Sequence, residues 1–498
     1  MNLATIIGTH PADAPALRFG NDIVTYGGLR AEVGALRGGL ISQGLQPDDR
    51  VVLMMASGRQ FIVSYFAVLG AGGIAVPLNP QSPTAEILRE IGDVRPSMLI
   101  LGPMGASTLT GQLSGHTGLT VIAPASTAMP GAVEFETVAA GTAGPLVERT
   151  DTDLAVLMFT SGTAGAPKAA MLTHGNLRAN LDQMQALGDA HLYSTDVVLA
   201  IPPLFHIYGL NATLGVTLAA GGCVIPVDRF DPTAVVATIV SAKVTILAGA
   251  PPVYEALASL PEDATTKAQF VSLRRAISGA SKLDPATGRA FAERFGIAVS
   301  EGYGLTEAAP VVTAAVGLTP KPGTIGAPLP GVSVRLVDES GDDALVGDAG
   351  EIWVRGPNVF PGYWEDATAS ANVLTADGWL RTGDIAVADT EGELTIVDRA
   401  KDLIIVSGFN VYPAEVEEVL ASHPDIVEAA VVGVSHPHTG ETVRAFVVAK
   451  PGAIIEADAL IAFSMRQLAR YKCPTSVDVV TELPKGLQGK VLRRALTV

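Results

Sequence analysis

The chain has 498 residues, of which 48% are hydrophobic and 17% are charged, and its formal net charge is −17. This length is too great for one ordinary hydrophobic core and this composition excludes a disordered chain, so we expect a globular protein with at least two domains. The acidic balance argues against a general nucleic-acid surface, so any anion must be bound by local lysines, arginines and backbone N–H groups.

The cysteines and the N-terminal residues bear on the compartment. Cys223 and Cys473 are the only cysteines and lie far apart in sequence, which argues against a disulfide framework or a zinc cluster and favours the reducing cytoplasm. The start, MNLATIIGTHPADAP, lacks the basic region and apolar core of a signal peptide. The run FIVSYFAVLGAGGIAVPL (61–78) approaches membrane-span length, but its GAGG and Pro77 favour a buried helix, a turn and a strand. We expect no integral span, which leaves only peripheral membrane contact open.

Short apolar runs alternate with helical stretches from Arg50 to about Ser300. The helical stretches include SPTAEILREIGDVRP and FDPTAVVATIVSAK, where Asp231 is expected to cap the helix and Pro232 to take its first position. This alternation predicts an α/β fold with largely parallel sheets in a large N-terminal domain. The runs expected to be strands are VVLMM (51–55), MLIL (98–101), LAVLMF (154–159), VVLAI (197–201) and VTIL (244–247).

The pattern changes after about Gly323, where TIGAPLPGVSVRLVD, GEIWVRG and GELTIVDR alternate apolar and polar residues. This predicts smaller antiparallel sheets or a barrel-like subdomain. The last hundred residues predict a small α+β domain, with a boundary near Arg399–Lys401. Its expected elements are a helix at 413–423, strands at 427–434 and 443–449, a helix at 457–471 and a strand at 476–480.

The stretch FTSGTAGAPK (159–168) directly follows an expected strand and is too rich in glycine and hydroxyl residues to continue it. Successive N–H groups in such a loop form a concave anion site, the hydroxyls add donors, and Lys168 adds a cation. The spacing from glycine to lysine is not that of a Walker A loop. A phosphate-binding loop and a plain surface turn are both compatible with this composition.

A second stretch, EGYGLTEAAP (301–310), follows an expected strand and places Tyr303 between two glycines, with Glu307 four residues on. The aromatic ring suits stacking against a purine, and the carboxylate suits Mg²⁺, which prefers oxygen ligands. A buried tyrosine with a solvated glutamate is the alternative. Further along, Asp384 in WLRTGD could accept from ribose hydroxyls and Arg399 in VDRAKD could bind an oxygen from the other side, while Lys490 lies in PKGLQGKVLRR. Each of these charges alone would be read as a solvated surface residue.

Taken in order, FTSGTAGAPK, PLFHIYGL, EGYGLTEAAP, GEIWVRGPNVFPGYW, LRTGDIA, VDRAKDLIIVSGFNVYPAEVE and PKGLQGKVLRR resemble the adenylate-forming superfamily. That superfamily includes acyl-CoA synthetases, adenylation domains of peptide synthetases and firefly-type luciferases, and the chain looks most like a bacterial fatty acyl-CoA synthetase. The resemblance runs from about residue 10 to the end. It implies that a carboxylic acid attacks ATP to give acyl-AMP and pyrophosphate, and that coenzyme A then takes the acyl group, with Mg²⁺ required.

The resemblance also implies roles for single residues. Lys490 would be the catalytic cation, His206 would lie near the acyl carboxylate, and Glu307 and Thr160 would lie at Mg²⁺. Residues 399–402 would form a hinge, with Lys401 as its pivot, between a core (1–398) and a mobile C-terminal domain (403–498). Gly408 would line the CoA channel. The residues expected to bind ATP are Thr160, Ser161, Gly162, Thr163, Gly165, Lys168, Gly279, Ala280, Ser281, Glu301, Gly302, Tyr303, Gly304, Thr306, Asp384, Ile396 and Arg399. The chain departs from the usual pattern at Ala164, Ser281–Lys282 and Asp398, and none of these removes a residue essential to the chemistry.

The segments expected to line the acyl site are IYGLNATLGV, AGAPPVY, SGAS and AAPVV, and they contain no arginine, aspartate or glutamate. Burying an unpaired substrate ammonium or second carboxylate there would cost roughly several kcal/mol. We therefore expect an apolar monocarboxylic acid, with a medium or long alkyl chain favoured by the small residues.

Several alternatives stay open at this point. They are an aryl-CoA ligase for coumarate- or benzoate-like acids, an acyl-AMP ligase that loads a carrier protein, and a regulatory nucleotide-binding protein. No insertion typical of acyl-AMP ligases precedes the C-terminal domain, and Lys490, Glu307 and Lys168 argue against lost catalysis. We expect no nucleic-acid partner, and the chain would be a monomer or a homodimer.

Overall fold

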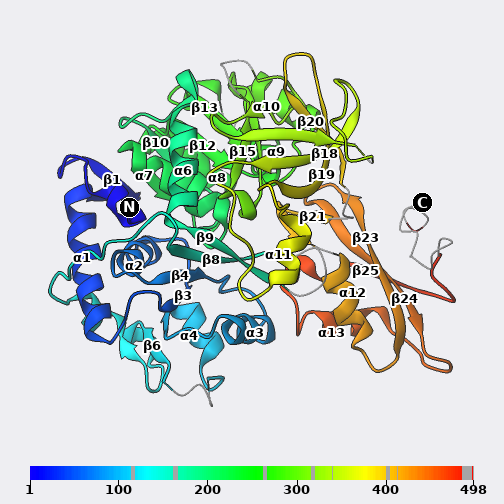
Figure 1. Ribbon diagram of the computed structural model, residues 1–498, viewed down its shortest axis with the longest axis horizontal. Coiled ribbons are helices and arrows are strands. Elements are labelled where there is room, and N and C mark those ends of the chain that lie inside the picture. The colour runs from blue at the N-terminus through cyan, green and yellow to red at the C-terminus, as the bar shows by residue number, and fades with distance from the viewer. Residues whose placement is uncertain are drawn as a thin grey trace. The chain divides into compact units, whose positions relative to one another are not determined.

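A computed structural model describes residues 1–113, 118–160, 167–261, 266–315, 320–338, 340–399, 404–411, 413–484 and 496. The chain divides into two compact units (Figure 1). The first contains Met1–Pro80, Val94–Met158 and Ala169–Val397, and the second contains Gln81–Asp93, Phe159–Lys168 and Asp398–Val498. The second unit therefore combines the C-terminal residues with two short segments from early in the chain.

A largely parallel sheet is formed in the first part of the sequence, with strand order β7-β6-β5-β3-β4-β8-β9. Strands β3 to β6 pair in parallel, as the alternation of apolar runs and helices predicted. The strands are β3 (Arg50–Met54), β4 (Ile74–Pro77), β5 (Met98–Leu101), β6 (Thr120–Ala123), β7 (Val133–Glu134), β8 (Leu154–Thr160) and β9 (Lys168–Thr173).

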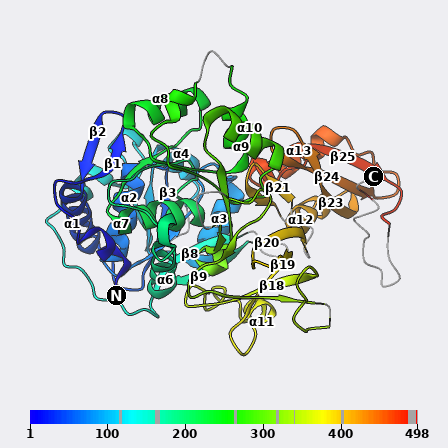
Figure 2. The same ribbon diagram turned by 90° about the horizontal axis from the view of Figure 1, so that it is seen from above.

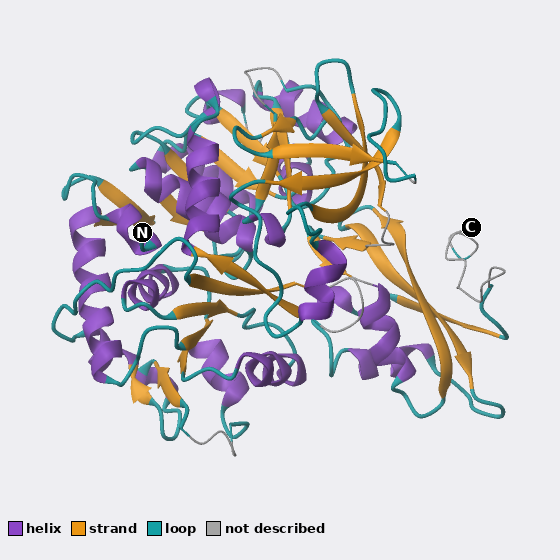
Figure 3. Cartoon of the chain, viewed as in Figure 1, coloured by secondary structure: helices purple, strands orange, loops and turns teal. Residues whose placement is uncertain are grey.

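A nine-stranded sheet has the order β16-β15-β14-β13-β12-β10-β11-β1-β2. Strands β10 to β14 are parallel to their neighbours, whereas β2, β15 and β16 are antiparallel additions at the edges. Figure 3 shows these strands running among helices. The strands are β1 (Pro15–Phe19), β2 (Asp22–Thr25), β10 (Val197–Ala200), β11 (Cys223–Pro226), β12 (Ile246–Gly249), β13 (Arg275–Ser278), β14 (Val299–Gly304), β15 (Val311–Ala314) and β16 (Ala327–Pro328).

The helices follow the local signals in the sequence. Asp231 caps α8 by accepting from the N–H of Ala234 at 2.8 Å, with Pro232 at the first position as expected. The run at 61–78 forms a buried helix and a strand, also as expected. The helices before the C-terminal residues, of which α3 belongs to the second unit, are α1 (Tyr26–Ser42), α2 (Arg59–Gly70), α3 (Thr84–Val94), α4 (Pro103–Leu109), α5 (Phe135–Ala139), α6 (His174–Gln185), α7 (Val216–Ala220), α8 (Pro232–Ala242), α9 (Pro251–Ala258), α10 (Pro285–Phe295) and α11 (Ala367–Val373). Among the residues that the structure describes, no helix is long and apolar enough to cross a membrane.

The residues with the alternating pattern after Gly323 form a sheet of order β17-β18-β19-β20, in which β17, β18 and β19 pair antiparallel. This confirms the predicted smaller antiparallel sheet. Its inner face contributes Ile352, Val354 and Leu380 to the main hydrophobic core of the first unit. The strands are β17 (Ser333–Val337), β18 (Ala349–Arg355), β19 (Leu380–Ala388) and β20 (Leu394–Arg399).

The second unit contains a sheet of order β22-β21-β24-β23, with β25 pairing in parallel with β24. The elements are β21 (Ile404–Val406), β22 (Phe409–Val411), α12 (Pro413–Ala421), β23 (Ile426–His436), β24 (Gly440–Ala449), α13 (Ala457–Ser464) and β25 (Ser476–Val480). The predicted helix at 457–471 is too long, because α13 ends at Ser464. The N–H of Ala469 donates to a carboxylate oxygen of Glu86 at 3.1 Å, so that backbone amide does not continue a helix.

A buried ion cluster lies within the second unit. The ammonium of Lys472 lies 3.2 Å from a carboxylate oxygen of Glu86 and 2.9 Å from one of Glu415, and the three side chains are at most 4% exposed. Ser82 donates a further hydrogen bond to Glu86. Because an unpaired buried charge is costly, this cluster fastens α3 to the C-terminal residues.

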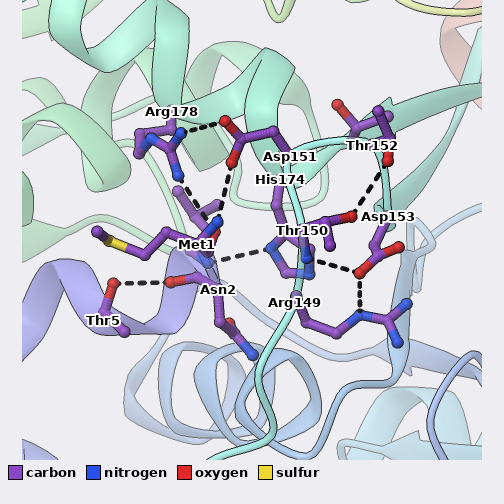
Figure 4. Close-up of polar contacts among 12 residues, drawn as sticks. Met1, Asn2, Thr5, Arg149, Thr150, Asp151, Thr152, Asp153, His174 and Arg178 are labelled. Atoms are coloured by element: carbon purple, nitrogen blue, oxygen red, sulfur yellow. Dashed lines mark hydrogen bonds and ion pairs between the residues drawn. The ribbon is translucent and has the colours of Figure 1, made fainter.

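The N-terminal residues are fastened to the turn before β8 and to the start of α6 (Figure 4). The Met1 ammonium lies 2.9 Å from the Asp151 carboxylate, which also pairs with Arg178 at 2.7 Å. The N–H of Leu3 donates to Nδ1 of His174 at 3.0 Å. Burial lowers the pKa of His174 to about 4, so its ring is neutral and can accept this bond near pH 7.

Candidate active site

Several of the predicted site residues lie where parallel strands of the nine-stranded sheet end. His206 follows β10, Gly279 to Lys282 follow β13, and Glu307 follows β14. The carboxyl ends of parallel strands meet at one edge of a sheet, which is where α/β proteins bind ligands. The order of the strands in the sheet therefore brings these separate segments to one edge.

Tyr303 and Asp384 lie in direct contact. The phenolic O–H of Tyr303 donates to a carboxylate oxygen of Asp384 at 2.7 Å, although the residues are 81 positions apart. The sequence suggested that Tyr303 follows a strand, but β14 continues through Gly304. The strand does so because its last residues exchange the parallel partner β13 for the antiparallel partner β15. A rigid strand thus holds the aromatic ring beside the carboxylate of β19.

Glu301 holds the segment after β13 in place. Its carboxylate accepts from the N–H of Leu283 at 2.9 Å, and the side chain is 7% exposed. Burial raises the pKa of Glu301, opposed by backbone hydrogen bonds that include the one from Leu283. In the same segment Ala280 has φ of +70°, and the Lys282 ammonium donates to the carbonyl oxygen of Ile396 at 3.4 Å. This segment therefore links β13, β14 and β20, and Glu301 acts as a positioning residue.

Glu307 is held by a residue to which the sequence reasoning gave no role. The O–H of Tyr363 donates to its carboxylate at 2.6 Å, and the N–H of Phe360 donates to its backbone oxygen at 2.9 Å. Both donors come from GEIWVRGPNVFPGYW, a motif that supported the resemblance without assigning any residue. The position of Tyr363 directly after Gly362 in this motif was the only sequence feature that pointed to this contact.

His206 precedes an unusual helix. Residues Tyr208–Gly215 form a π-helix, a form that occurs often at functional sites. Nδ1 of His206 accepts from the N–H of Tyr208 at 3.3 Å, and burial lowers the pKa of His206 to about 4, so the imidazole is neutral near pH 7. The Tyr208 hydroxyl donates to the carbonyl oxygens of Gly249 and Ile277, at the ends of β12 and β13. A neutral donor at this edge can approach a carboxylate without a fixed charge of its own.

The sequence matches two family descriptions over most of its length. Residues 4–364 match AMP-binding enzyme, and residues 415–490 match AMP-binding enzyme C-terminal domain. The chain belongs to the AMP-binding enzyme family.

Relatives of this AMP-binding enzyme cover nearly the whole chain. Feruloyl-CoA synthase from Amycolatopsis sp is 37% identical over 482 residues, which are 96% of this chain and 94% of the relative. Long-chain-fatty-acid–CoA ligase from Bacillus subtilis is 35% identical over 514 residues, covering 97% and 91%. The crystal structure of ATP-bound MatB from Rhodopseudomonas palustris has 33% identity and a TM-score of 0.74, covering 99% and 98%. The chain is thus an ATP-dependent, AMP-forming acyl-CoA ligase of the adenylate-forming superfamily.

The structure describes only some of the residues predicted to contact phosphate, to form the hinge or to act in catalysis. Ser161, Gly162, Thr163 and Gly165 lie outside the described residues, as do the departure Ala164, the hinge residue Lys401 and the catalytic candidate Lys490. Thr160 ends β8, as the sequence predicted for the residues before the glycine-rich segment, and Lys168 begins β9, a strand that the sequence analysis did not predict. Arg399 ends β20, and Gly408 has φ of +83° in the turn between β21 and β22.

Two hydroxyl groups at strand ends are buried without a partner in the described part of the chain. The hydroxyls of Thr160 and Ser278 are buried and have no hydrogen-bond partner among the described residues, which is costly unless a ligand supplies one. The carboxylate of Glu307 is the kind of oxygen ligand that Mg²⁺ prefers. When bound, Mg²⁺ would neutralise phosphate charge. No group of three or more metal-ligating side chains occurs within the described ranges.

Proposed function

We propose that the chain activates an apolar monocarboxylic acid, with a medium or long alkyl chain, and transfers it to CoA. The acid's carboxylate attacks the α-phosphate of ATP, forming a carboxyl–phosphate bond and releasing pyrophosphate. The CoA thiolate then attacks the acyl carbon, and AMP leaves. Charge positioning carries such phosphoryl chemistry, so the nucleotide contacts matter more than covalent groups.

The Tyr303–Asp384 contact is the observation that carries this proposal. Asp384 accepts a hydrogen bond from Tyr303. Its carboxylate would accept from the ribose hydroxyls, and the ring beside it would stack against adenine. Glu307, oriented by Tyr363, would hold Mg²⁺. Lys490 would supply the cation where the acid meets the α-phosphate, and His206 would orient the acid's carboxylate with a neutral ring.

The segments expected to line the acyl site support an apolar acid. The side-chain amide of Asn211 donates to the backbone carbonyl oxygens of Leu177 and Ala309. The hydroxyl of Tyr254 donates to the backbone carbonyl oxygen of Ile277. These polar groups of Asn211 and Tyr254 bond within the protein, and the segments carry no ionised side chain for a second substrate charge. Each buried methylene of a substrate would contribute about 0.8 kcal/mol.

An aryl acid is the second candidate, and a specific contact favours it. A Cβ added to Gly279 would lie 3.2 Å from the ring of Tyr208, so the glycine lets this ring pack close to the strand edge. A flat aromatic acid could stack there. The 37% identity to a feruloyl-CoA synthase supports the same reading.

A substrate panel tests both candidates. Straight-chain acids from four to eighteen carbons, benzoate, coumarate and ferulate would each be supplied with ATP, Mg²⁺ and CoA, and AMP and acyl-CoA would be measured together. We expect AMP and acyl-CoA in equal amounts, with the highest kcat/KM for a medium or long alkyl acid. A maximum on ferulate or coumarate would replace the alkyl proposal by the aryl one. AMP formation without acyl-CoA would contradict transfer to CoA.

A further inference from the structure

Five consecutive backbone carbonyl oxygens, those of residues 307–311, each accept a hydrogen bond. This segment begins with Glu307, the carboxylate expected at Mg²⁺, and it lies in the first unit. Two of the oxygens accept from backbone N–H groups, and three accept from side-chain amides. The donors are the N–H of Phe360 to Glu307, Nδ2 of Asn358 to Ala308, Nδ2 of Asn211 to Ala309, the N–H of Leu305 to Pro310 and Nδ2 of Asn180 to Val311, at 2.9, 2.8, 2.7, 3.0 and 2.8 Å.

The three asparagines are almost fully buried, and Gln183 joins two of them. Asn180, Asn211 and Asn358 are at most 1% exposed, and Gln183 is 6% exposed. Nε2 of Gln183 donates to Oδ1 of Asn358 at 3.2 Å, and Oε1 of Gln183 accepts from Nδ2 of Asn180 at 3.1 Å. Oδ1 of Asn180 also accepts from the N–H of Val311 at 3.1 Å. These four side chains, the amide cluster, therefore hold one another as well as the backbone.

The amide cluster comes from three separate parts of the first unit. Helix α6 supplies two of the amides, and the π-helix supplies Asn211. Asn358 lies in the connection from β18 to α11, whose two ends are labelled in Figure 2. The same connection supplies Tyr363, whose O–H donates to the Glu307 carboxylate at 2.6 Å. The main chain at Glu307 and the carboxylate itself are thus held from the same side chains' neighbourhood.

The amides hold a backbone conformation that helices and strands do not use. Ala309 has φ of +65°, in the left-handed region, which residues with a Cβ rarely adopt and which persists where surrounding contacts determine it. Ala308 and Ala309 are fully buried, and a buried backbone oxygen without a partner is costly. Because side-chain amides supply these partners, the chain can turn directly after Glu307 and remain fixed there.

We propose that Asn180, Asn211 and Asn358, with Gln183 holding two of them, are positioning residues for the metal carboxylate in acyl-AMP formation. They act through the main chain, because each asparagine donates to a backbone oxygen of 307–311 and not to the carboxylate. A misplacement of ~1 Å can cost about a hundredfold in rate, so a fixed backbone at Glu307 matters for the chemistry. This inference rests on the proposed role of Glu307 at Mg²⁺.

Calorimetric titration with α,β-methylene-ATP tests the inference without turnover, because this analogue cannot be cleaved between its α- and β-phosphates. The Kd would be measured once in EDTA and once in excess Mg²⁺. The ratio of the first value to the second, the metal ratio, reports how much Mg²⁺ strengthens nucleotide binding. A residue that positions the metal carboxylate should change this ratio, whereas a residue that only stabilises the fold should not.

Three variants of the amide cluster should lower the metal ratio and leave the Kd in EDTA unchanged. Asn211→Leu and Asn358→Leu each remove a donor to segment 307–311 and should lower the ratio by about tenfold, the usual effect of losing a group that orients a metal ligand. Gln183→Met keeps much of the volume and contacts none of the five oxygens, so we expect a smaller loss of about threefold. Urea unfolding checks the fold of each variant, and Gln183→Met carries the test if a leucine variant does not fold.

Two reference variants make the result specific. Asn2 is 3% exposed, and its amide donates to the backbone oxygens of Leu69 and Val147 at 2.6 and 2.9 Å, away from segment 307–311. Asn2→Leu therefore removes a matched buried amide in the same unit and should keep the wild-type metal ratio. Glu307→Gln should lower the ratio at least as far as the leucine variants do.

The possible outcomes separate this inference from the proposed function. A wild-type metal ratio in the folded amide variants, together with a lowered ratio in Glu307→Gln, would overturn the positioning role and leave the metal role of Glu307 intact. A ratio that Glu307→Gln does not change would contradict the metal role and this inference with it. An equal loss in Asn2→Leu would assign the effect to general destabilisation and would also overturn the inference.

Discussion

Replacing Lys472 by methionine should open the contact between α3 and the C-terminal residues. The ammonium of Lys472 is the cation that pairs with the buried carboxylates of Glu86 and Glu415, at 3.2 and 2.9 Å. Methionine keeps much of the volume but leaves both carboxylates buried without the ammonium that pairs with them. Breaking a buried ion pair in this way costs about 3–5 kcal/mol. At 1.36 kcal/mol per factor of ten, the local opening equilibrium should rise by about two to four powers of ten.

Hydrogen exchange on the full chain measures this opening directly. Amides of α3 should exchange faster in the Lys472→Met variant, whereas amides of β10 in the first unit should keep their wild-type protection. Adding Glu86→Gln and Glu415→Gln to the same variant removes the stranded charges and should recover most of the protection. Unchanged exchange in α3, or faster exchange everywhere in the chain, would refute the reasoning.

Three further outcomes follow from the described contacts and the implied roles. Burial, with the nearby charge of Glu86, raises the pKa of Glu90 to about 8. Between about pH 4.3 and pH 8 the folded protein therefore holds a proton that the unfolded chain has lost. The free energy of unfolding falls as the pH rises through this interval. Glu90→Gln should thus gain stability over the wild type in urea unfolding between pH 5 and 9, and a constant difference would contradict the shift. Asp384→Asn should raise KM for ATP by about tenfold or more, because a hydrogen bond to a charged group contributes ~1.5–3 kcal/mol; an unchanged KM in steady-state assays would argue against a ribose contact. Lys490→Ala should reduce pyrophosphate release by at least about a hundredfold while thioester formation from supplied acyl-AMP continues, and pyrophosphate release at the wild-type rate would exclude the assigned role.

Local patterns in the sequence were enough to predict most of the elements. The valine-rich runs at 51–55 and 98–101 form β3 and β5, and Asp231 with Pro232 begins α8. These signals act over a few residues, because periodicity reports which face of an element is buried and a cap reports a single turn. The order of the motifs likewise identified the family, since many specific stretches had to occur together.

Contacts between distant residues could not be predicted in this way. Lys472 and Glu86 are 386 positions apart, and each alone reads as a solvated charge. The same contact explains why the helix expected at 457–471 was too long, because Glu86 binds the backbone of Ala469. Tyr363 was missed as a partner of Glu307 for the same reason. Only the folded chain shows which polar side chains meet, and these are the contacts that orient the candidate site.

We propose that Tyr303, Asp384 and Glu307 form the nucleotide site of this AMP-binding enzyme. A crystal structure of the chain grown with AMP and Mg²⁺ tests it most directly. We expect the adenine ring against Tyr303 and the ribose hydroxyls within hydrogen-bonding distance of Asp384. AMP bound at any other place in the chain, with Asp384 contacting only Tyr303, would contradict it.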